Sequence, residues 1–407
     1  MDRRVLFATL IVFAGGAAGV GVSVFAFVGL DDATADTEIL WQSDPADGDD
    51  GSGAVVATVD GDPYVLQLAA DRDAAGTAIR AIDADGTVAW TAPLPDGIDA
   101  DGASDLVVGE FDGDPVVALT THDGRLVARS AVDGAERFVV PIGGDGGLAP
   151  AFIDRTGDGT NALVAVHDAG GVIGVDAAGE TTFETELDGD GALRPLAIAG
   201  DESATPDDTA LTGVGIAVLT EDVDGQRVTV VDGSGDVVWT ERTDGTALGW
   251  TAVDTRRGAV LALGGAGGTL TTLEAVDGSL RYEVGLQDVP VDVGAADAGR
   301  IHVGGTGDVW AVDSLDGEVV WKQQYGGETR VNAPAVGDLT GDGTPDVIAV
   351  NRGGELLGMN RNGEAVARGS VGDEVVYANP MAADLTGDGR EEVLVVTERG
   401  SVIAVAT

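Results

Sequence analysis

A phrase rich in aspartate and glycine recurs at a fixed spacing along this chain of 407 residues. Its sharpest copies are Pro-Ala-Val-Gly-Asp-Leu-Thr-Gly-Asp-Gly-Thr-Pro-Asp at 334–346 and Pro-Met-Ala-Ala-Asp-Leu-Thr-Gly-Asp-Gly-Arg-Glu-Glu at 380–392. Their first aspartates, Asp338 and Asp384, are 46 residues apart. A third copy starts at Asp154, 184 residues before Asp338, which is four such periods. A period of this length is typical of solenoids and propellers built from one supersecondary unit.

A second marker, here called the tag, accompanies the phrase: an apolar strand, an Asp/Gly turn, and a short strand that ends in an aromatic residue. Residues 311–321 give its clearest copy, Ala-Val-Asp-Ser-Leu-Asp-Gly-Glu-Val-Val-Trp. Tags end at Trp90, Phe138, Phe183, Trp239, Tyr282 and Trp321, and at Ala367, where alanine replaces the aromatic residue. The mean gap from Trp90 to Ala367 is again about 46 residues. An eighth tag, Ile-Leu-Trp at 39–41, stands near the front of the chain.

Together the markers predict an all-β, eight-bladed propeller, with seven blades as the alternative if two tags share one sheet. The expected blades span 54–90, 104–138, 148–183, 193–239, 247–282, 289–321, 331–367 and 377–407. The chain stops at Thr407 before the last tag strand, so we expect residues 38–42 to supply it and to close the ring. Closure is how such all-β chains remove exposed sheet edges. An insertion at 200–209 replaces the phrase in its blade, which should therefore lack the phrase's chemistry.

The charge of the chain indicates an environment of high salt and excludes one class of partner. Aspartate and glutamate number 70 against 22 lysines and arginines, a formal net charge of −48, yet 44% of residues are hydrophobic. In molar salt a Debye length of about 3 Å screens the self-repulsion of such a chain. We therefore interpret the protein as one from a halophilic archaeon, with acidity serving solvation; a basic partner is the alternative. Nucleic acid is excluded as a partner because the sequence offers no basic surface.

Catalytic motifs are missing from the sequence. It has no cysteine, which excludes disulfides, iron–sulfur sites and thiol catalysis. Its three histidines, His122, His167 and His302, fall in repeat strands or turns rather than in one motif. No nucleophile motif, phosphate-binding loop or zinc spacing is present. The sequence therefore favours a non-enzymatic protein, although a carboxylate pair of a lyase or glycosidase cannot be recognised among 70 acids.

The N-terminus carries a membrane or export signal. After Arg3 and Arg4, residues 5–30 are uncharged, and a helix of that length, about 39 Å, crosses a hydrocarbon core of about 30 Å. The arginines place the short end in the cytoplasm, which leaves residues 31–37 as a tether and the propeller, 38–407, outside the cell. Retention as a single-pass signal anchor is the first interpretation. Cleavage after Ala-Thr-Ala at 33–35, with secretion, is the alternative.

These residues carry two family resemblances. The phrase Asp-Leu-Thr-Gly-Asp-Gly-x-x-Asp/Glu resembles the FG-GAP/VCBS repeat of integrin-type propellers, whose calcium loop reads Asp-x-Asn/Asp-x-Asp-Gly-x-x-Asp. The tag at 307–321 is similar to the PQQ-like repeat of quinoprotein dehydrogenases and of the BamB-like scaffold family. The tag recurs over most of 38–407, whereas the phrase is sharp in three places only. The first resemblance implies calcium, and the second implies a propeller that is either a scaffold or an enzyme.

Carboxylates at positions 1, 5 and 9 around a glycine turn can converge on a hard cation. The FG-GAP resemblance implies a first calcium site at Asp338, Asp342 and Asp346, with the Thr344 carbonyl and Thr340, and a second at Asp384, Asp388 and Glu392, with the Arg390 carbonyl and Thr386. A third, at Asp154, Thr156, Asp158 and Thr160, is incomplete because position 9 is Ala162. The alternative is an Asp–Gly turn with solvated carboxylates and no metal.

The PQQ-like resemblance leaves an enzyme as the alternative function. Quinoprotein dehydrogenases have longer chains, a tryptophan stacked beneath the quinone and usually a vicinal cysteine disulfide. This chain has no cysteine, and its tag aromatics are explained by packing between blades. We therefore expect calcium but no pyrroloquinoline quinone (PQQ). The prediction is a calcium-stabilised binding or scaffolding propeller at the cell surface, whose partner, a protein or a surface glycan, the sequence does not identify.

Overall fold

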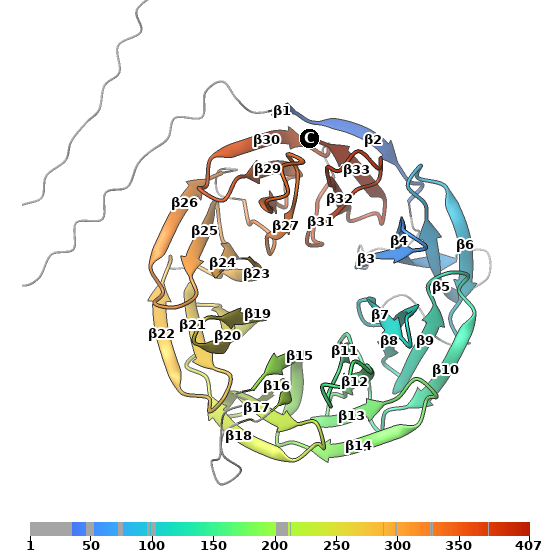
Figure 1. Cartoon of the computed structure of the whole chain (residues 1–407), viewed down its shortest axis with the longest axis vertical. Coiled ribbons are helices and arrows are strands. Elements are labelled where there is room, and N and C mark those ends of the chain that lie inside the picture. The colour runs from blue at the N-terminus through green and yellow to red at the C-terminus, as the bar shows by residue number, and fades with distance from the viewer. Residues whose placement is uncertain are drawn as a thin grey trace, which may run out of the picture. The chain divides into compact units, whose positions relative to one another are not determined.

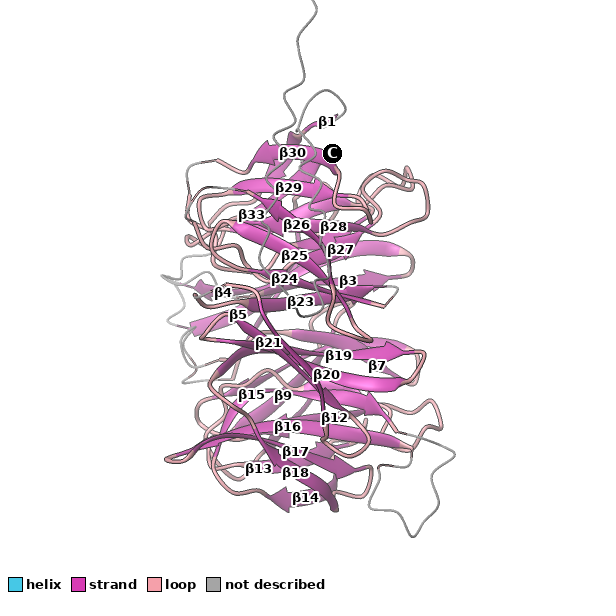
Figure 2. Cartoon of the chain, turned by 90° about the vertical axis from the view of Figure 1, so that its left-hand side faces the viewer, coloured by secondary structure: helices cyan, strands magenta, loops and turns pink. Residues whose placement is uncertain are grey.

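The computed structural model describes residues 35–45, 53–71, 76–95, 98, 103–200, 211, 213–287, 289–297, 299–325, 327, 329–372 and 374–407. The predicted anchor at 5–30 and the insertion, apart from Gly200, lie outside these ranges. Every regular element within them is a strand (Figure 2). No described segment is a helix with the length and apolarity needed to cross a membrane.

Eight sheets form a ring, so the prediction of an eight-bladed propeller is confirmed and the seven-bladed alternative is wrong (Figure 1). Six blades are four-stranded meanders of consecutive strands. Blade 1 consists of β3 (Ala54–Val59), β4 (Asp62–Asp71), β5 (Gly76–Ile82) and β6 (Val88–Pro93). Blade 2 consists of β7 (Val107–Phe111), β8 (Asp114–Thr121), β9 (Arg125–Ser130) and β10 (Glu136–Pro141). Blade 3 consists of β11 (Ala151–Ile153), β12 (Ala162–Val166), β13 (Gly171–Val175) and β14 (Thr181–Glu186). Blade 4 consists of β15 (Asp190–Ala199), β16 (Val214–Asp222), β17 (Gly225–Asp232) and β18 (Val237–Arg242). Blade 5 consists of β19 (Ala247–Thr255), β20 (Gly258–Gly265), β21 (Thr269–Glu274) and β22 (Leu280–Gly285). Blade 6 consists of β23 (Asp292–Asp297), β24 (Arg300–Gly304), β25 (Asp308–Asp313) and β26 (Val319–Gln324).

The last two blades incorporate the N-terminal segment. Blade 7 is β27 (Ala335–Gly337), β28 (Asp346–Val350), β29 (Glu355–Met359) and β30 (Ala365–Ser370), and blade 8 is β31 (Met381–Ala383), β32 (Glu392–Val396) and β33 (Val402–Ala406). β2 (Glu38–Gln42) is the fourth strand of blade 8 and pairs antiparallel with β33. β1 (Ala35–Asp36) pairs parallel with β30 as a fifth strand of blade 7, where the sequence analysis expects a tether. The N-terminal segment therefore bridges two blades.

The blades are held together by eight buried apolar clusters, each shared by two neighbouring blades of the described ring. The second strands of blades 3, 7 and 8 are buried along their whole length, as expected for strands covered on both sides. The outer strands alternate instead, and β14 buries Phe183 between exposed neighbours. At the seam, Val65 and Ile82 of blade 1 pack with Leu394 and Val402 of blade 8, so the ring is closed by a core like the others.

The tag aromatics link successive blades. Each packs against the positive-φ glycine in the tag turn of the next blade, where a Cβ would lie between 2.6 and 3.0 Å from the aromatic side chain. The pairs are Trp41 with Gly86, Trp90 with Gly134, Phe138 with Gly179, Phe183 with Gly235, Trp239 with Gly278, Tyr282 with Gly317, and Trp321 with Gly363. The blade after Ala367 has no such turn, because β2 rather than a hairpin completes it. An aromatic residue at position 367 would thus have no tag-turn glycine to contact.

A buried arginine reinforces the seam. Arg80 on β5 is 8% exposed, and its guanidinium donates to Gln67 Oε1 (2.7 Å), to the carbonyl oxygen of Asp44 (2.9 Å) and to that of Gly400 (3.3 Å). It also donates to Ser43 Oγ (3.3 Å). Burial lowers the pKa of Arg80, and the charge of Asp44 acts against that shift. One side chain therefore joins blade 1, the last hairpin of blade 8 and the N-terminal segment.

The meander gives the ring two different faces. Because strands alternate in direction, turns from the first to the second strand and from the third to the fourth lie on one face, here called the turn face. Turns from the second to the third strand, and the connections between blades, lie on the other, here called the connector face. The three Asp/Gly phrases join first to second strands, at β11–β12, β27–β28 and β31–β32, and so share the turn face.

Candidate functional site

The first aspartate of each phrase shapes its loop. In blade 7, Asp338 Oδ1 accepts hydrogen bonds from the backbone N–H groups of Gly341 (2.8 Å) and Asp342 (3.1 Å), and Oδ2 accepts one from Gly343 (2.7 Å). Although burial acts to raise the pKa of Asp338, these bonds hold it below its ordinary value. Both glycines have positive φ, 72° and 78°, which the turn requires. A carboxylate at position 1 thus organises the loop before any metal is considered.

The other two loops repeat this geometry. Asp384 accepts from Gly387 and Gly389, and Asp154 accepts from Gly157, Asp158 and Gly159. At position 5 the carboxylate accepts the backbone N–H of position 7: Asp342 from Thr344, Asp388 from Arg390, and Asp158 from Thr160. The incomplete third loop is therefore as well formed as the complete ones. Asp–Gly turn chemistry explains positions 1, 5 and 6 without a cation.

Position 9 distinguishes the loops. In blade 7 it is Asp346, which is 3% exposed and whose Oδ2 has no hydrogen-bond partner among the described residues. Burial raises its pKa to about 6; the negative charges of Asp342 and Asp338 add to the rise, and a hydrogen bond with Thr340 opposes it. A buried, unpaired carboxylate oxygen under the negative charges of two further carboxylates is costly while it is ionised. Protonation of Asp346 or a nearby cation would remove that cost.

In blade 8 the carboxylate at position 9 is hydrogen-bonded within its own loop. Glu392 is 4% exposed, and its Oε2 accepts the backbone N–H of Leu385 at 2.7 Å, while Oε1 accepts from the Thr386 hydroxyl at 3.4 Å. Burial raises the pKa of Glu392, and the charge of Asp388 adds to the rise. In blade 3 the position holds Ala162, which is buried in the sheet and offers no ligand.

The predicted ligands thus share their loops but do not close around one point. Within the described ranges, no three or more histidine, aspartate or glutamate side chains come close enough together to hold a metal ion. In the third loop, hydrogen bonds from the Thr160 backbone and the Thr156 hydroxyl lower the pKa of Asp158, so both threonines turn toward a carboxylate. The loops have the carboxylate spacing on which the calcium prediction rests, but the described side chains do not come together as a metal site.

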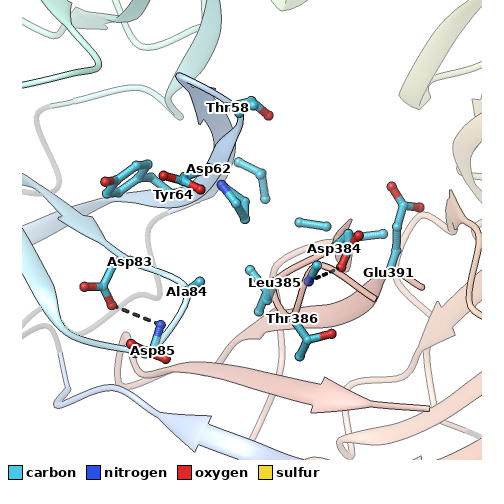
Figure 3. Close-up of a pocket in the computed structure, with 16 residues that line it drawn as sticks. Thr58, Asp62, Tyr64, Asp83, Ala84, Asp85, Asp384, Leu385, Thr386 and Glu391 are labelled. Carbon is cyan, nitrogen blue, oxygen red and sulfur yellow. Dashed lines mark hydrogen bonds between the residues drawn. The ribbon is translucent and has the colours of Figure 1, made fainter. Parts of the chain in front are cut away.

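The turn face contains a cleft that no sequence motif predicts. It has a volume of 640 Å³ and opens between blades 8 and 1, beside the blade 8 loop. Figure 3 shows Asp62 and Tyr64 on one wall and Asp384 and Thr386 on the other, with Asp83 and Asp85 below. Its walls come from opposite ends of the chain, so no local pattern marks it. The cleft is polar and acidic.

The connector face carries a different group of side chains near blades 7 and 8. Tyr377 is 51% exposed and lies against the guanidinium of Arg352, whose Cζ is 5.1 Å from the ring centroid. Arg399 lies 3.6 Å from Glu374 in the same region. Arginine and tyrosine dominate the energetics of many protein interfaces. No motif in the sequence marks this group, because its members come from two turns, β28–β29 and β32–β33, and from the connection between blades 7 and 8.

Fold and loops together define the class: a closed eight-bladed propeller of tag-bearing repeats. A family described as "Outer membrane protein assembly factor BamB" matches residues 224–407, from the β16–β17 turn to the C-terminus. This match supports the PQQ-like part of the predicted resemblance. It does not extend to the FG-GAP/VCBS part or to a halophilic origin, and both stay predictions. None of the curated proteins matches the chain by sequence.

Solved structures support the fold around the whole ring. BamB from Moraxella catarrhalis matches with a TM-score of 0.58 at 18% identity, over 91% of this chain and 98% of that one. The computationally designed Ika8 protein matches with a TM-score of 0.65 at 15% identity, over 91% and 99%. The quinohemoprotein alcohol dehydrogenase ADHIIG from Pseudomonas putida HK5 matches with a TM-score of 0.60 at 13% identity, over 91% and 76%. At these identities the likeness concerns the fold alone.

Proposed function

We propose that the protein is an extracytoplasmic, calcium-stabilised propeller that acts as a binding or scaffolding module and not as an enzyme. The observation that carries this proposal is the match of residues 224–407 to a family described as an assembly factor, on a ring that resembles BamB around its circumference. The tag aromatics support it, because each is engaged between blades rather than arranged as a stack for a cofactor. Fold likeness by itself would not decide function.

The proposal places the partner on the connector face. The loops that we assign to calcium occupy the turn face, and on the opposite side the exposed ring of Tyr377 lies against the half-buried Arg352. Residues 5–30 would hold the ring at the outer surface of the membrane. Retention of this anchor agrees with β1, because cleavage after Ala35 would divide a strand that pairs with β30.

Alanine in place of Tyr377 is expected to reduce capture of the native partner at least tenfold, since a central aromatic anchor contributes about 2 kcal/mol or more to an interface. The measurement is affinity capture from native membranes in molar salt, with quantitative mass spectrometry of the captured proteins. The matched control is Val132→Ala, which alters a side chain of equal exposure, 50%, in a tag turn on the turn face. Equal capture by both variants would refute the assignment of the connector face.

The same preparation tests the enzyme alternative. A quinoprotein dehydrogenase would retain PQQ absorbance after purification, or acquire it on addition of PQQ and calcium, and would then oxidise alcohols in the presence of an electron acceptor. Either result would replace the scaffold proposal by the enzymatic one. Turnover of polysaccharides without a quinone would instead favour the lyase or glycosidase alternative.

Chelation of calcium is expected to lower the melting temperature in constant molar salt without unfolding the ring at room temperature. At a calcium concentration a hundredfold above the dissociation constant, each occupied site adds about 2.7 kcal/mol. Asp342→Ala or Asp388→Ala should remove most of one site's increment, whereas Asp158→Ala, in the incomplete loop, should change little. A melting temperature indifferent to chelation would mean that the loops are only turns.

The pH dependence provides a second arm of this experiment. The folded pKa of Asp346, about 6, lies above the ordinary value of 3.8, so without metal the group favours the folded state most at low pH. Chelated protein should therefore lose stability as the pH rises through about 6, and Asp346→Asn should reduce that loss to the part contributed by Glu392, whose pKa burial also raises. With calcium the trend should reverse, because the metal binds the deprotonated carboxylate.

A further inference from the structure

Arg352, on the connector face, is a half-buried cation without an ionic partner. Among the described arginines that are not exposed, it is the one whose side chain makes no hydrogen bond or ion pair with another described residue. Its Nε is buried without an acceptor, and the side chain is held by the ring of Tyr377, 5.1 Å from Cζ. The chain has 70 acids for 22 lysines and arginines, so a cation left unpaired indicates an acceptor from outside the chain.

Hydrogen bonds of the backbone hold this cation and the aromatic ring in place. The N–H of Arg352 donates to the Arg330 carbonyl at 2.9 Å, and the Arg352 carbonyl accepts from the N–H of Val376, the residue before Tyr377, at 3.3 Å. Asn332 Nδ2 in turn donates to the Val376 carbonyl at 3.1 Å. Ring and guanidinium are therefore positioned before any ligand arrives, which reduces the entropy that binding would cost.

The two arginines nearest to Arg352 along this face already have carboxylate partners. Arg330, in the connection between blades 6 and 7, lies 3.5 Å from Asp292, and Arg399, in the β32–β33 turn, lies 3.6 Å from Glu374. Burial raises the pKa of Asp292, and the charges of Arg330 and Arg352 oppose that rise. No described carboxylate lies within ion-pair distance of Arg352 itself, so its guanidinium is the group of this patch that is free to bind an anion.

The chemistry of the pair selects the kind of anion. A guanidinium presents a planar fork of N–H groups that matches a carboxylate, and stacking on an aromatic ring fixes the plane of that fork. Tyr377, 51% exposed, adds a surface on which an apolar side chain can pack. A nucleic acid or another long polyanion would meet the acidic remainder of the surface, whereas a single carboxylate in an apolar segment would not.

We propose that Arg352 and Tyr377 form a receptor for an aspartate or glutamate side chain that lies in an apolar segment of the partner protein. This inference rests on the proposed binding function and deepens it by stating the chemistry of the partner. The carboxylate accepts hydrogen bonds from the terminal nitrogens of Arg352, which make none to described residues, while an apolar neighbour packs on Tyr377. The buried Nε takes no part in the contact.

The test uses the full-length protein in detergent and constant molar salt, with the peptide acetyl-Val-Glu-Val-Asp-Val-amide as probe and saturation-transfer NMR as the measurement. The acidic peptide should bind about tenfold more tightly than its neutral analogue, acetyl-Val-Gln-Val-Asn-Val-amide, because hydrogen bonds between charged groups are the stronger kind. Arg352→Met should abolish this preference. Arg256→Met, which removes an exposed arginine in the β19–β20 turn on the turn face, should keep it.

Two further variant measurements separate recognition from general attraction and from a structural role. Arg352→Lys keeps the charge without the planar fork and should lose most of the preference; full retention would mean unspecific attraction and would overturn the receptor. Arg352→Met removes a cation whose Nε has no acceptor, so its melting temperature should be no lower than that of the unsubstituted protein. A clear fall would make Arg352 a structural residue and would also overturn the inference.

The remaining outcomes separate this inference from the proposed function. The acidic peptide, unlike the neutral one, should release the native partner from the unsubstituted protein. Equal binding of the two peptides, or binding of inorganic phosphate without binding of the acidic peptide, would overturn the carboxylate receptor. If Tyr377→Ala still weakens capture of the partner in that case, the connector face stays the interface. Equal capture by Tyr377→Ala and Val132→Ala would refute the interface as well.

Discussion

Gly363→Ala is expected to lower the free energy of unfolding by about 3 kcal/mol, the larger part through a steric clash between blades. Gly363 has a φ of 80°, and a Cβ there would lie 2.8 Å from ring carbons of Trp321, whose residue is 9% exposed. An L-residue in this conformation costs about 1–2 kcal/mol, and forcing an extra methyl group into a packed site costs about 1–3 kcal/mol. Trp321 cannot withdraw easily, because its Nε1 donates to the Arg361 carbonyl at 3.1 Å.

Gly113→Ala separates the two contributions. Gly113 has nearly the same φ, 82°, in the β7–β8 turn, but nothing lies within 4 Å of the position its Cβ would take. The control should therefore show only the conformational cost of about 1–2 kcal/mol. The free energies of unfolding of the Gly363→Ala and Gly113→Ala variants are measured by urea unfolding in constant salt. If the two variants lose the same stability, packing of tag aromatics on tag glycines does not hold blades together.

Arg80→Met is expected to lower the free energy of unfolding by about 2 kcal/mol, because it leaves the buried Gln67 Oε1 without its donor, at about 1–3 kcal/mol. The Gly400 and Asp44 carbonyl oxygens lose one hydrogen bond each but keep those from Gln67 Nε2 and Ser43 Oγ. Methionine conserves much of the volume, so the loss reports the hydrogen bonds rather than a cavity. The acceptors Gln67 Oε1 and the Asp44 and Gly400 carbonyl oxygens are neutral. The deficit should therefore persist from low to molar salt.

Arg137→Met is the matched control for a surface cation. Arg137 lies 2.7 Å from Asp114, and the two side chains are 31% and 65% exposed. Such a pair contributes about 0–1 kcal/mol and is screened by salt. Hydrogen exchange should also show faster opening of β2 and β33 in the Arg80 variant and not in the control. A deficit that disappears in molar salt would contradict the interpretation of Arg80 as a hydrogen-bonding clamp at the seam.

The blade number was predictable because the tag is a local pattern that makes a packing contact at seven of the eight junctions between blades. An aromatic residue and a turn glycine recur with the period of the supersecondary unit, and each glycine receives the aromatic side chain of the blade before it. The exception at Ala367 is visible in the sequence, but its reason is not. Only the ring shows that the following blade lacks a tag turn, since its fourth strand is β2 from the other end of the chain.

The candidate calcium loops, too, were predictable from the sequence only in part. Spacing of carboxylates within nine residues can be read from the sequence, and the backbone hydrogen bonds to Asp338, Asp384 and Asp154 follow from local turn chemistry. Burial of Asp346 and the hydrogen bond from the Asp338 N–H of the blade 7 loop to Glu391 Oε2 of the blade 8 loop depend on neighbouring strands and blades. No pattern within one repeat encodes the contacts that it makes with the next.

By itself the sequence determined the repeat, the number of blades and the positions of the three phrases, because those depend on interactions within about 46 residues. The tertiary structure decided what lies at the junctions: the fifth strand β1 on blade 7, the clamp of Arg80, the acidic cleft between blades 8 and 1, and the link between two loops. Residues more than 300 positions apart meet there, as Arg80 and Gly400 do. Their meeting depends on closure of the ring, which is a property of all eight blades together.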